Sequence, residues 1–347
     1  LINSYYLIAT FYFKKENYKQ SKEHLKKGIN ICKNNKIEDV SLFYLVNLLN
    51  VIEVESEILP TNETIINLNL QLALSEKIFK KNSYEYFIAI GKIASYYMKI
   101  EDIKNAEEYI LKTLDIAESL YGKTNDNYII AINNVVRFYI NYNNLINADF
   151  YNEIGLKIVL EKYGNRHKEY LNFLSDKATI KINLGKYKEA AKIYDECIGL
   201  AKDLYGRNSE FYGTMISNSV EPYLKLGGSF ENAEKLFLID LEITKKHYGL
   251  KHPKTAMCYT RLGNTNSSMK KDEIAIEYFL KAKQIFNDLK LENLEYANLL
   301  SFLGTEYLLI EKHEEAEKYY QESYLIKSER LKKNDLTKLI ILNNLFL

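Results

Sequence analysis

The sequence predicts an all-helical protein built from about eight repeated helical hairpins. Of its 347 residues, 47% are hydrophobic and 27% are charged, so the chain can bury a core and is unlike sequences that stay disordered. It contains only 3 Pro and 14 Gly, too few turn residues for a fold made of many short strands. Marker residues also recur about every 42 residues along the chain, which is typical of repeat proteins.

Two sets of marker residues define the repeat. Tyr-Gly pairs begin at Tyr121, Tyr163, Tyr205 and Tyr248, at spacings of 42, 42 and 43 residues. A small residue opens each expected second helix: Ser21, Thr64, Ala106, Ala148, Ala190, Ala233, Ala275 and Ala316. The markers predict units at 1–36, 37–80, 81–122, 123–164, 165–206, 207–249, 250–291 and 292–333.

The unit at 165–206 shows the expected hairpin most simply. Apolar residues recur at three- and four-residue spacing over 171–184 and again over 187–204, and Gly185 separates the two stretches. A hairpin of this size cannot bury its apolar face alone, so the units are expected to stack. The stack forms a superhelix with a long concave wall, a geometry that serves binding.

Two units depart from the pattern. The unit at 37–80 has no small residue in its Leu48–Ile52 stretch and carries Pro60 in its connector. The unit at 207–249 has Pro222 inside its first helix, so we expect that helix to kink or to start late.

The end of the chain continues the register. Leu339, Leu342 and Leu345 fall where a ninth unit would place its apolar residues, so 334–347 is interpreted as the start of that unit. The chain begins without Met and stops within this unit. We therefore expect one continuous solenoid over 1–347 that is part of a longer polypeptide.

The eighth unit resembles the tetratricopeptide repeat, with matching residues at Ala297, Leu300, Leu303, Gly304, Tyr307, Ala316, Tyr320 and Ser323. The long period and the Tyr-Gly-x-x-His-Pro connector at 248–253 resemble the kinesin-light-chain-like subclass. This long repeat is common in bacterial regulatory proteins, where it is often fused to a caspase-like protease (CHAT) domain, a kinase or a nucleotide-driven switch domain. The resemblance implies a right-handed superhelical solenoid of about eight such hairpins. The chain departs from it in having no Trp.

Composition excludes several functional classes. The net charge of +1 argues against general nucleic-acid binding. No stretch reaches the roughly 18 apolar residues of a membrane span. The chain has an odd number of cysteines, Cys32, Cys197 and Cys258, and they lie far apart in the sequence. This pattern predicts buried, unpaired cysteines in a reducing compartment. We therefore expect a cytoplasmic protein.

No catalytic motif stands out. The sequence lacks a glycine-rich phosphate loop, and His247 and His252 flank a connector without Cys or paired acids, which favours a surface role over a metal site. Cys197 and Cys258 occupy helix positions that face the core. We therefore expect no enzymatic activity, no metal and no cofactor within this segment.

The expected concave wall supplies the candidate site. Its first helices carry short polar residues and two arginines between the packing positions: Asn133, Asn134, Arg137, Asn172, Ser175, Asp176, Asn218, Thr260, Arg261 and Asn264. A ladder of amides can hold the backbone of an extended peptide, and arginines can pair with acidic side chains. A polar face is also the ordinary property of any solvated helix.

Two functions follow from this interpretation. The first is a scaffold that binds a peptide or a folded protein partner in its groove, and the alternative is a sensor arm of a larger enzyme, a CHAT-type protease or a signalling ATPase. The sequence does not indicate the oligomeric state.

Overall fold

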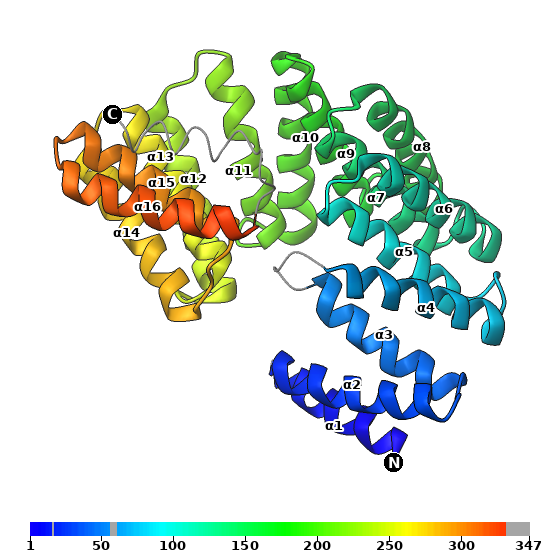
Figure 1. Ribbon diagram of the computed structural model, residues 1–347. Coiled ribbons are helices and arrows are strands. Elements are labelled where there is room, and N and C mark those ends of the chain that lie inside the picture. The colour runs from blue at the N-terminus through cyan, green and yellow to red at the C-terminus, as the bar shows by residue number, and fades with distance from the viewer. Residues whose placement is uncertain (16, 56–60, 331–347) are drawn as a thin grey trace. The chain divides into compact units, whose positions relative to one another are not determined.

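The computed structural model describes residues 1–15, 17–55 and 61–330, and the chain over these ranges forms sixteen α-helices and no strand (Figure 1). The all-helical prediction is confirmed. Within the same ranges, no helix combines the length and the apolar character needed to cross a membrane. Pro60 and the expected ninth unit at 334–347 lie outside the described residues.

The chain divides into two compact units, Leu1–Lys162 and Tyr163–Leu347. A single continuous solenoid therefore stays a prediction. The first unit holds α1 (Ile2–Lys14), α2 (Tyr18–Asn34), α3 (Val40–Glu55), α4 (Asn62–Phe79), α5 (Tyr84–Lys99), α6 (Ile103–Tyr121), α7 (Asp126–Asn141) and most of α8 (Leu145–Tyr163).

The second unit contains α9 (Lys168–Asn183), α10 (Tyr187–Tyr205), α11 (Glu210–Lys225), α12 (Phe230–Tyr248), α13 (Pro253–Ser268), α14 (Asp272–Leu289), α15 (Leu294–Leu309) and α16 (His313–Arg330). Each helix from α9 to α16 packs against the next. Helix α11 begins at Glu210 with Pro222 in its last turn, so the expected late start is wrong.

The connectors between hairpins use one backbone conformation. Gly122, Gly164, Gly206 and Gly249 end the preceding helices with φ between 74° and 82°, a region that residues with a Cβ avoid. Lys80 occupies the corresponding place after α4 with a φ of 79° and a ψ of 163°. The Tyr-Gly repeat is therefore a chain-reversal signal, and Lys80 adopts the same conformation without being glycine.

Two histidines complete these connectors. Nδ1 of His167 accepts the backbone N–H of Glu169, and Nδ1 of His252 accepts that of Lys254, each at 3.2 Å. Each ring also stacks on the tyrosine four residues earlier, at centroid distances of 4.0 and 4.4 Å. Both histidines thus act as N-terminal caps, for α9 and α13.

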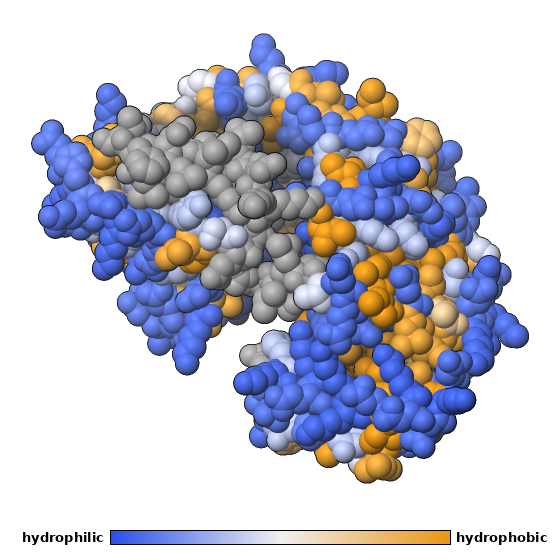
Figure 2. Space-filling view, in the orientation of Figure 1, coloured by the Kyte–Doolittle hydropathy of each residue, from blue (hydrophilic) through white to orange (hydrophobic). Residues whose placement is uncertain are grey.

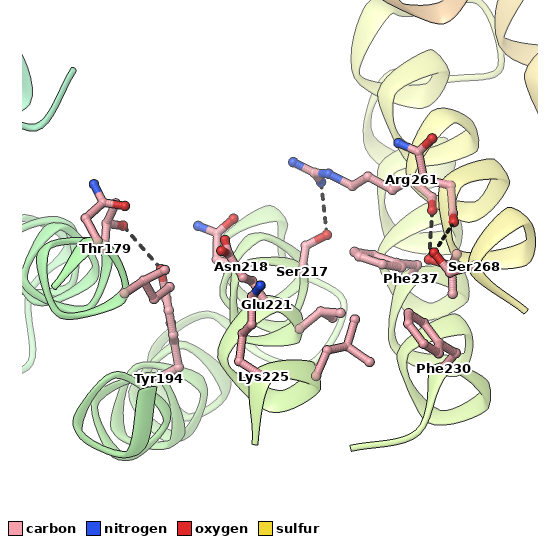
Figure 3. A pocket seen from close by; sticks show the side chains of 16 residues that line it. Thr179, Tyr194, Ser217, Asn218, Glu221, Lys225, Phe230, Phe237, Arg261 and Ser268 are labelled. Atoms are coloured by element: carbon pink, nitrogen blue, oxygen red, sulfur yellow. Dashed lines mark hydrogen bonds between the residues drawn. The ribbon is translucent and has the colours of Figure 1, made fainter. Parts of the chain in front are cut away.

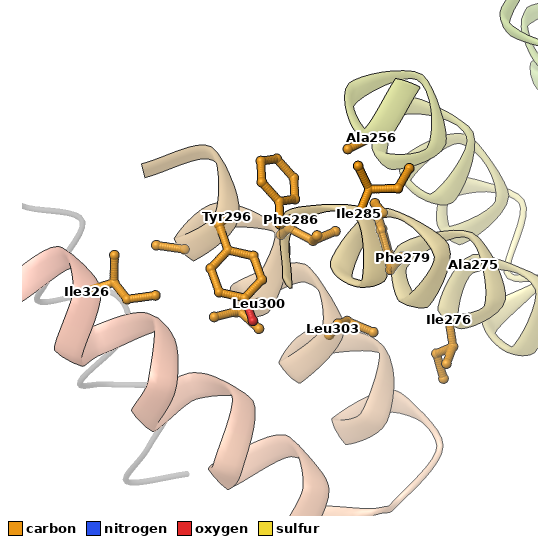
Figure 4. Close-up of a cluster of buried hydrophobic side chains, with 13 residues drawn as sticks. Ala256, Ala275, Ile276, Phe279, Ile285, Phe286, Tyr296, Leu300, Leu303 and Ile326 are labelled. Atoms are coloured by element: carbon orange, nitrogen blue, oxygen red, sulfur yellow. The ribbon is translucent and has the colours of Figure 1, made fainter. Parts of the chain in front are cut away.

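Aromatic rings pack directly on glycine where the two helices of a hairpin cross. A Cβ on Gly263 of α13 would lie 2.4 Å from Cε1 of Phe279 on α14, and one on Gly304 of α15 would lie 2.9 Å from the Tyr320 ring on α16. Phe279 belongs to a buried cluster with Tyr296 and Leu300 (Figure 4).

In the space-filling view, hydrophilic residues cover most of the visible face and hydrophobic ones form smaller patches between them (Figure 2).

Gly263→Ala is expected to destabilise the protein by about 1–3 kcal/mol, because the buried Phe279 ring cannot move aside and the helices must separate. Urea denaturation followed by circular dichroism measures the change.

Gly199→Ala on α10 is the matched control, since no atom of another helix lies within 4 Å of the added Cβ. This change should stabilise the helix by about 0.5–1 kcal/mol. Equal effects of the two substitutions would contradict the role assigned to the crossing.

Candidate functional site

A groove of about 750 Å³ lies within the second unit (Figure 3). Five successive helices, α9 to α13, contribute to it, and we call it the α9–α13 groove. Its lining residues are Thr179, Ile182, Asn183, Tyr194, Ser217, Asn218, Val220, Glu221, Leu224, Lys225, Phe230, Phe237, Arg261, Asn264, Thr265 and Ser268.

Helical periodicity aligns the polar side chains of the groove. Asn218, Glu221 and Lys225 follow one another on α11 at spacings of three and four residues. Arg261, Asn264 and Ser268 repeat those spacings on α13, so each helix presents one row of polar groups. The first helices of the hairpins supply these rows, whereas α10 and α12 supply the aromatic residues.

A buried carboxylate positions the arginine of the groove. Asp240 on α12 is 6% exposed, and its Oδ2 accepts hydrogen bonds from Ser217 Oγ at 2.7 Å and from Arg261 Nη1 at 3.3 Å. Arg261 Nη1 also donates to Ser217 Oγ at 2.9 Å. Because α11, α12 and α13 each contribute one group, the guanidinium is held over the groove by the packing of the hairpins (Figure 3).

Asp240 is not among the site residues predicted from the sequence. A Cβ on Gly213 would lie 2.8 Å from Asp240 Oδ1, so the glycine permits the carboxylate to approach α11. Its position in the sequence could have revealed it. Asp240 lies three residues after Phe237 and four before Thr244, on the buried stripe of α12. A carboxylate on such a stripe requires a partner from another helix.

Two amides of the groove have unused hydrogen-bonding groups. Among the described residues, the side chains of Asn218 and Asn264 make no hydrogen bond, and both are half-buried. Each amide offers donors and an acceptor. Val220, Leu224 and Phe237 supply an apolar surface in the same groove, so it can contact both the backbone and the side chains of a peptide.

The structure brings together only part of the predicted site. Asn218, Arg261 and Asn264 share the α9–α13 groove. Asn134 and Arg137 of α7 instead line a smaller cavity of about 280 Å³ between helices of the first unit.

The other predicted residues line neither cavity. Asn172 donates its amide to Glu169 Oε2 at 3.1 Å, and Thr260 donates to the backbone oxygen of Ala256 at 3.0 Å. Ser175 is buried, whereas Asn133 and Asp176 are half-buried residues outside the grooves described above. The pattern of polar and apolar residues along a helix does not distinguish residues that are buried or bonded within their own helix from residues that line a groove.

The three thiols are buried. Burial raises the pKa of the Cys197 thiol from 9.0 to about 12, with a smaller contribution from Glu196. Burial also raises the pKa of the Cys258 thiol to about 12, with Asp240 adding to the effect. Both thiols are protonated at neutral pH and are therefore poor nucleophiles. Across the described residues, no group of His, Cys, Asp and Glu is arranged to hold a metal ion.

We expect the free energy of unfolding to fall as the pH rises above 9. The folded-state pKa of Cys197 and Cys258 is raised, so their contribution is complete below pH 9 and is lost between pH 9 and about 12. Each thiol should reduce stability by about 1.4 kcal/mol per pH unit in this range. Urea denaturation between pH 8 and 10.5 measures the slope.

The Cys197→Ala/Cys258→Ala double variant is the control, and its stability should fall less steeply with pH. A wild-type slope equal to that of the variant would show that the thiols do not contribute.

Models of the tetratricopeptide repeat match residues 2–35, 172–204 and 261–329. The chain therefore contains tetratricopeptide repeats, as the sequence resemblance predicted. Proteins with this helical-repeat fold are typically non-catalytic scaffolds for protein interactions. Comparison with curated proteins gives no match.

Several solved structures share the fold at low sequence identity. A Rap protein in complex with competence and sporulation factor is 12% identical with a TM-score of 0.58, and the match covers 99% of this chain and 95% of that one. BtubC (BKLC) from P. vanneervenii is 16% identical with a TM-score of 0.53, over 69% of this chain and 94% of that one. A STAND protein with a tetratricopeptide repeat sensor, PH0952 from Pyrococcus horikoshii, is 18% identical with a TM-score of 0.50, over 94% of this chain and 52% of that one.

Proposed function

We propose that the chain is a non-enzymatic protein-interaction module that holds an extended peptide segment of a protein partner in the α9–α13 groove. The observation that carries this proposal is the combination of the held Arg261 guanidinium with the unused amides of Asn218 and Asn264. Amides recognise peptide backbone, and a guanidinium recognises carboxylates. The structure of a Rap protein in complex with competence and sporulation factor supports this proposal, because that protein shares the fold and holds a binding partner.

The remaining predictions about partners fit this proposal. The near-zero net charge opposes a nucleic-acid partner, and the groove combines apolar and polar surface as peptide sites do. Neither a cofactor nor a metal is needed for such binding, and a cytoplasmic location is part of the proposal.

Photocrosslinking tests the location of the bound segment. Benzoylphenylalanine at Asn264 should crosslink, in extract of the source cells, to one or a few peptide segments that mass spectrometry then identifies. Benzoylphenylalanine at the exposed Lys192 of α10, outside the groove, is the matched control. Equal crosslinking from both positions would place the partner elsewhere.

The identified segment, made as a synthetic peptide, then tests the residues. Asn218→Ala/Asn264→Ala should weaken its binding about tenfold, because each amide loses hydrogen bonds to the peptide, while helical content stays unchanged. Arg261 is left intact in this experiment, since its removal would leave the Asp240 carboxylate buried without its cation. Unchanged affinity would refute the assignment of the groove amides.

We also propose, as an alternative, that the chain is the sensor arm of a larger enzyme, a CHAT-type protease or a signalling ATPase. The fold shared with a STAND protein that carries a tetratricopeptide repeat sensor supports this alternative. Intact-mass and peptide mass spectrometry on the protein from its source separates the two. A mass well above that of these 347 residues, with peptides from a non-repeat domain, favours the sensor arm. A mass close to that of these residues, without such peptides, favours the scaffold.

A further inference from the structure

The hairpin of α11 and α12 carries a second cavity, of about 620 Å³, that shares no residue with the α9–α13 groove. Its lining consists of the connector before α11, the first turn of that helix and one face of α12. The residues are Arg207, Asn208, Tyr212, Leu238, Ile239, Glu242, Ile243 and Lys246, and we call this the Tyr212 surface.

Two adjacent apolar side chains distinguish this surface from the other hairpins. Leu238 and Ile239 are 38% and 43% exposed, and they stand five and six residues after Ala233, the small residue that marks the helix. The same two positions in every other second helix include at least one polar residue: Lys26–Lys27, Asn69–Leu70, Leu111–Lys112, Glu153–Ile154, Asp195–Glu196, Leu280–Lys281 and Gln321–Glu322. Helix α12 alone presents two apolar residues there.

In two of the other hairpins, the second of these positions carries a glutamate that accepts a hydrogen bond from a tyrosine of the first helix. Tyr170 donates its hydroxyl to Glu196 at 3.5 Å, and Tyr296 donates to Glu322 at 3.0 Å. In the α11–α12 hairpin, Tyr212 occupies the corresponding place and Ile239 replaces the glutamate. Among the described residues, the Tyr212 hydroxyl makes no hydrogen bond, so it lacks the carboxylate partner that Tyr170 and Tyr296 have.

Two cationic side chains line the same cavity as Tyr212. Arg207 and Lys246 are exposed, and neither forms an ion pair within the described part of the chain. Glu242, the acidic residue of the surface, is already paired with Lys245 at 3.1 Å. The surface therefore combines an apolar floor with donors that favour a carboxylate.

We propose that the Tyr212 surface binds an acidic, amphipathic peptide segment of a protein partner. A carboxylate of the partner accepts from the Tyr212 hydroxyl and pairs with Arg207 and Lys246. Apolar side chains next to that carboxylate pack on Leu238 and Ile239, which removes their exposed area from water. The partner thus supplies from outside the acidic group that the α9–α10 and α15–α16 hairpins carry themselves.

A phage-displayed library of random 12-residue peptides tests this proposal on the full chain. Peptides are selected on the wild-type protein after depletion on Ile239→Glu, which introduces the Tyr-Glu pair of the α9–α10 and α15–α16 hairpins and removes an apolar side chain of the surface. Depletion also discards peptides that bind the α9–α13 groove. We expect the recovered peptides to contain Asp or Glu beside apolar residues.

Fluorescence anisotropy with the recovered peptides gives the quantitative result. Arg207→Glu/Lys246→Glu should weaken binding about tenfold or more, with a larger effect at low salt. Asn218→Ala/Asn264→Ala, the matched control in the groove, should leave this binding unchanged. The result for the Tyr212 surface therefore does not depend on whether a peptide binds in the α9–α13 groove.

Three outcomes would overturn the inference. Recovered peptides could lack acidic residues, or they could bind the Arg207→Glu/Lys246→Glu variant as tightly as wild type. A concentration-dependent dimer of the wild-type chain that Ile239→Glu abolishes would instead make a second copy the occupant.

Discussion

The close crossing of two helices within a hairpin is the constraint on which the rest of the structure depends. At Gly263 and Gly304 an aromatic ring of the second helix lies on the backbone of the first, and a single added carbon would overlap the ring. Helices that cross this closely leave little room for adjustment, because protein interiors are packed like crystals. The two helices of each of these hairpins are therefore held in a fixed position relative to one another.

The packing of the helices also positions the side chains of the α9–α13 groove. Gly213 allows Asp240 to approach α11, and Asp240 in turn holds Ser217 and Arg261. Three helices from two hairpins thus fix one guanidinium. A group held in this way loses little rotamer freedom when a ligand binds, whereas a flexible arginine would lose more.

Much of the fold could be predicted from the sequence, but less of the site. The repeat markers located the hairpins because the small residues and Tyr-Gly pairs serve local geometry, such as the positive φ of Gly206 and Gly249. Asn218, Arg261 and Asn264 could be expected to line one groove because polar rows on first helices follow from helical periodicity, and their role in binding stays a prediction. Asp240 was missed because its role depends on contacts with two other helices, and Asn134 was grouped with a groove that it does not line.

The connector after α4 has a consequence for how the first unit opens. Lys80 adopts a backbone conformation that glycine provides after α6, and a side chain in this region costs about 1–3 kcal/mol. That strain is released when the connector unravels, so it lowers the free energy of local opening there. Backbone amides at the start of α5 should therefore exchange with solvent earlier than those at the start of α7. The same connector is therefore a place where local opening would give a protease or a chaperone access to the first unit.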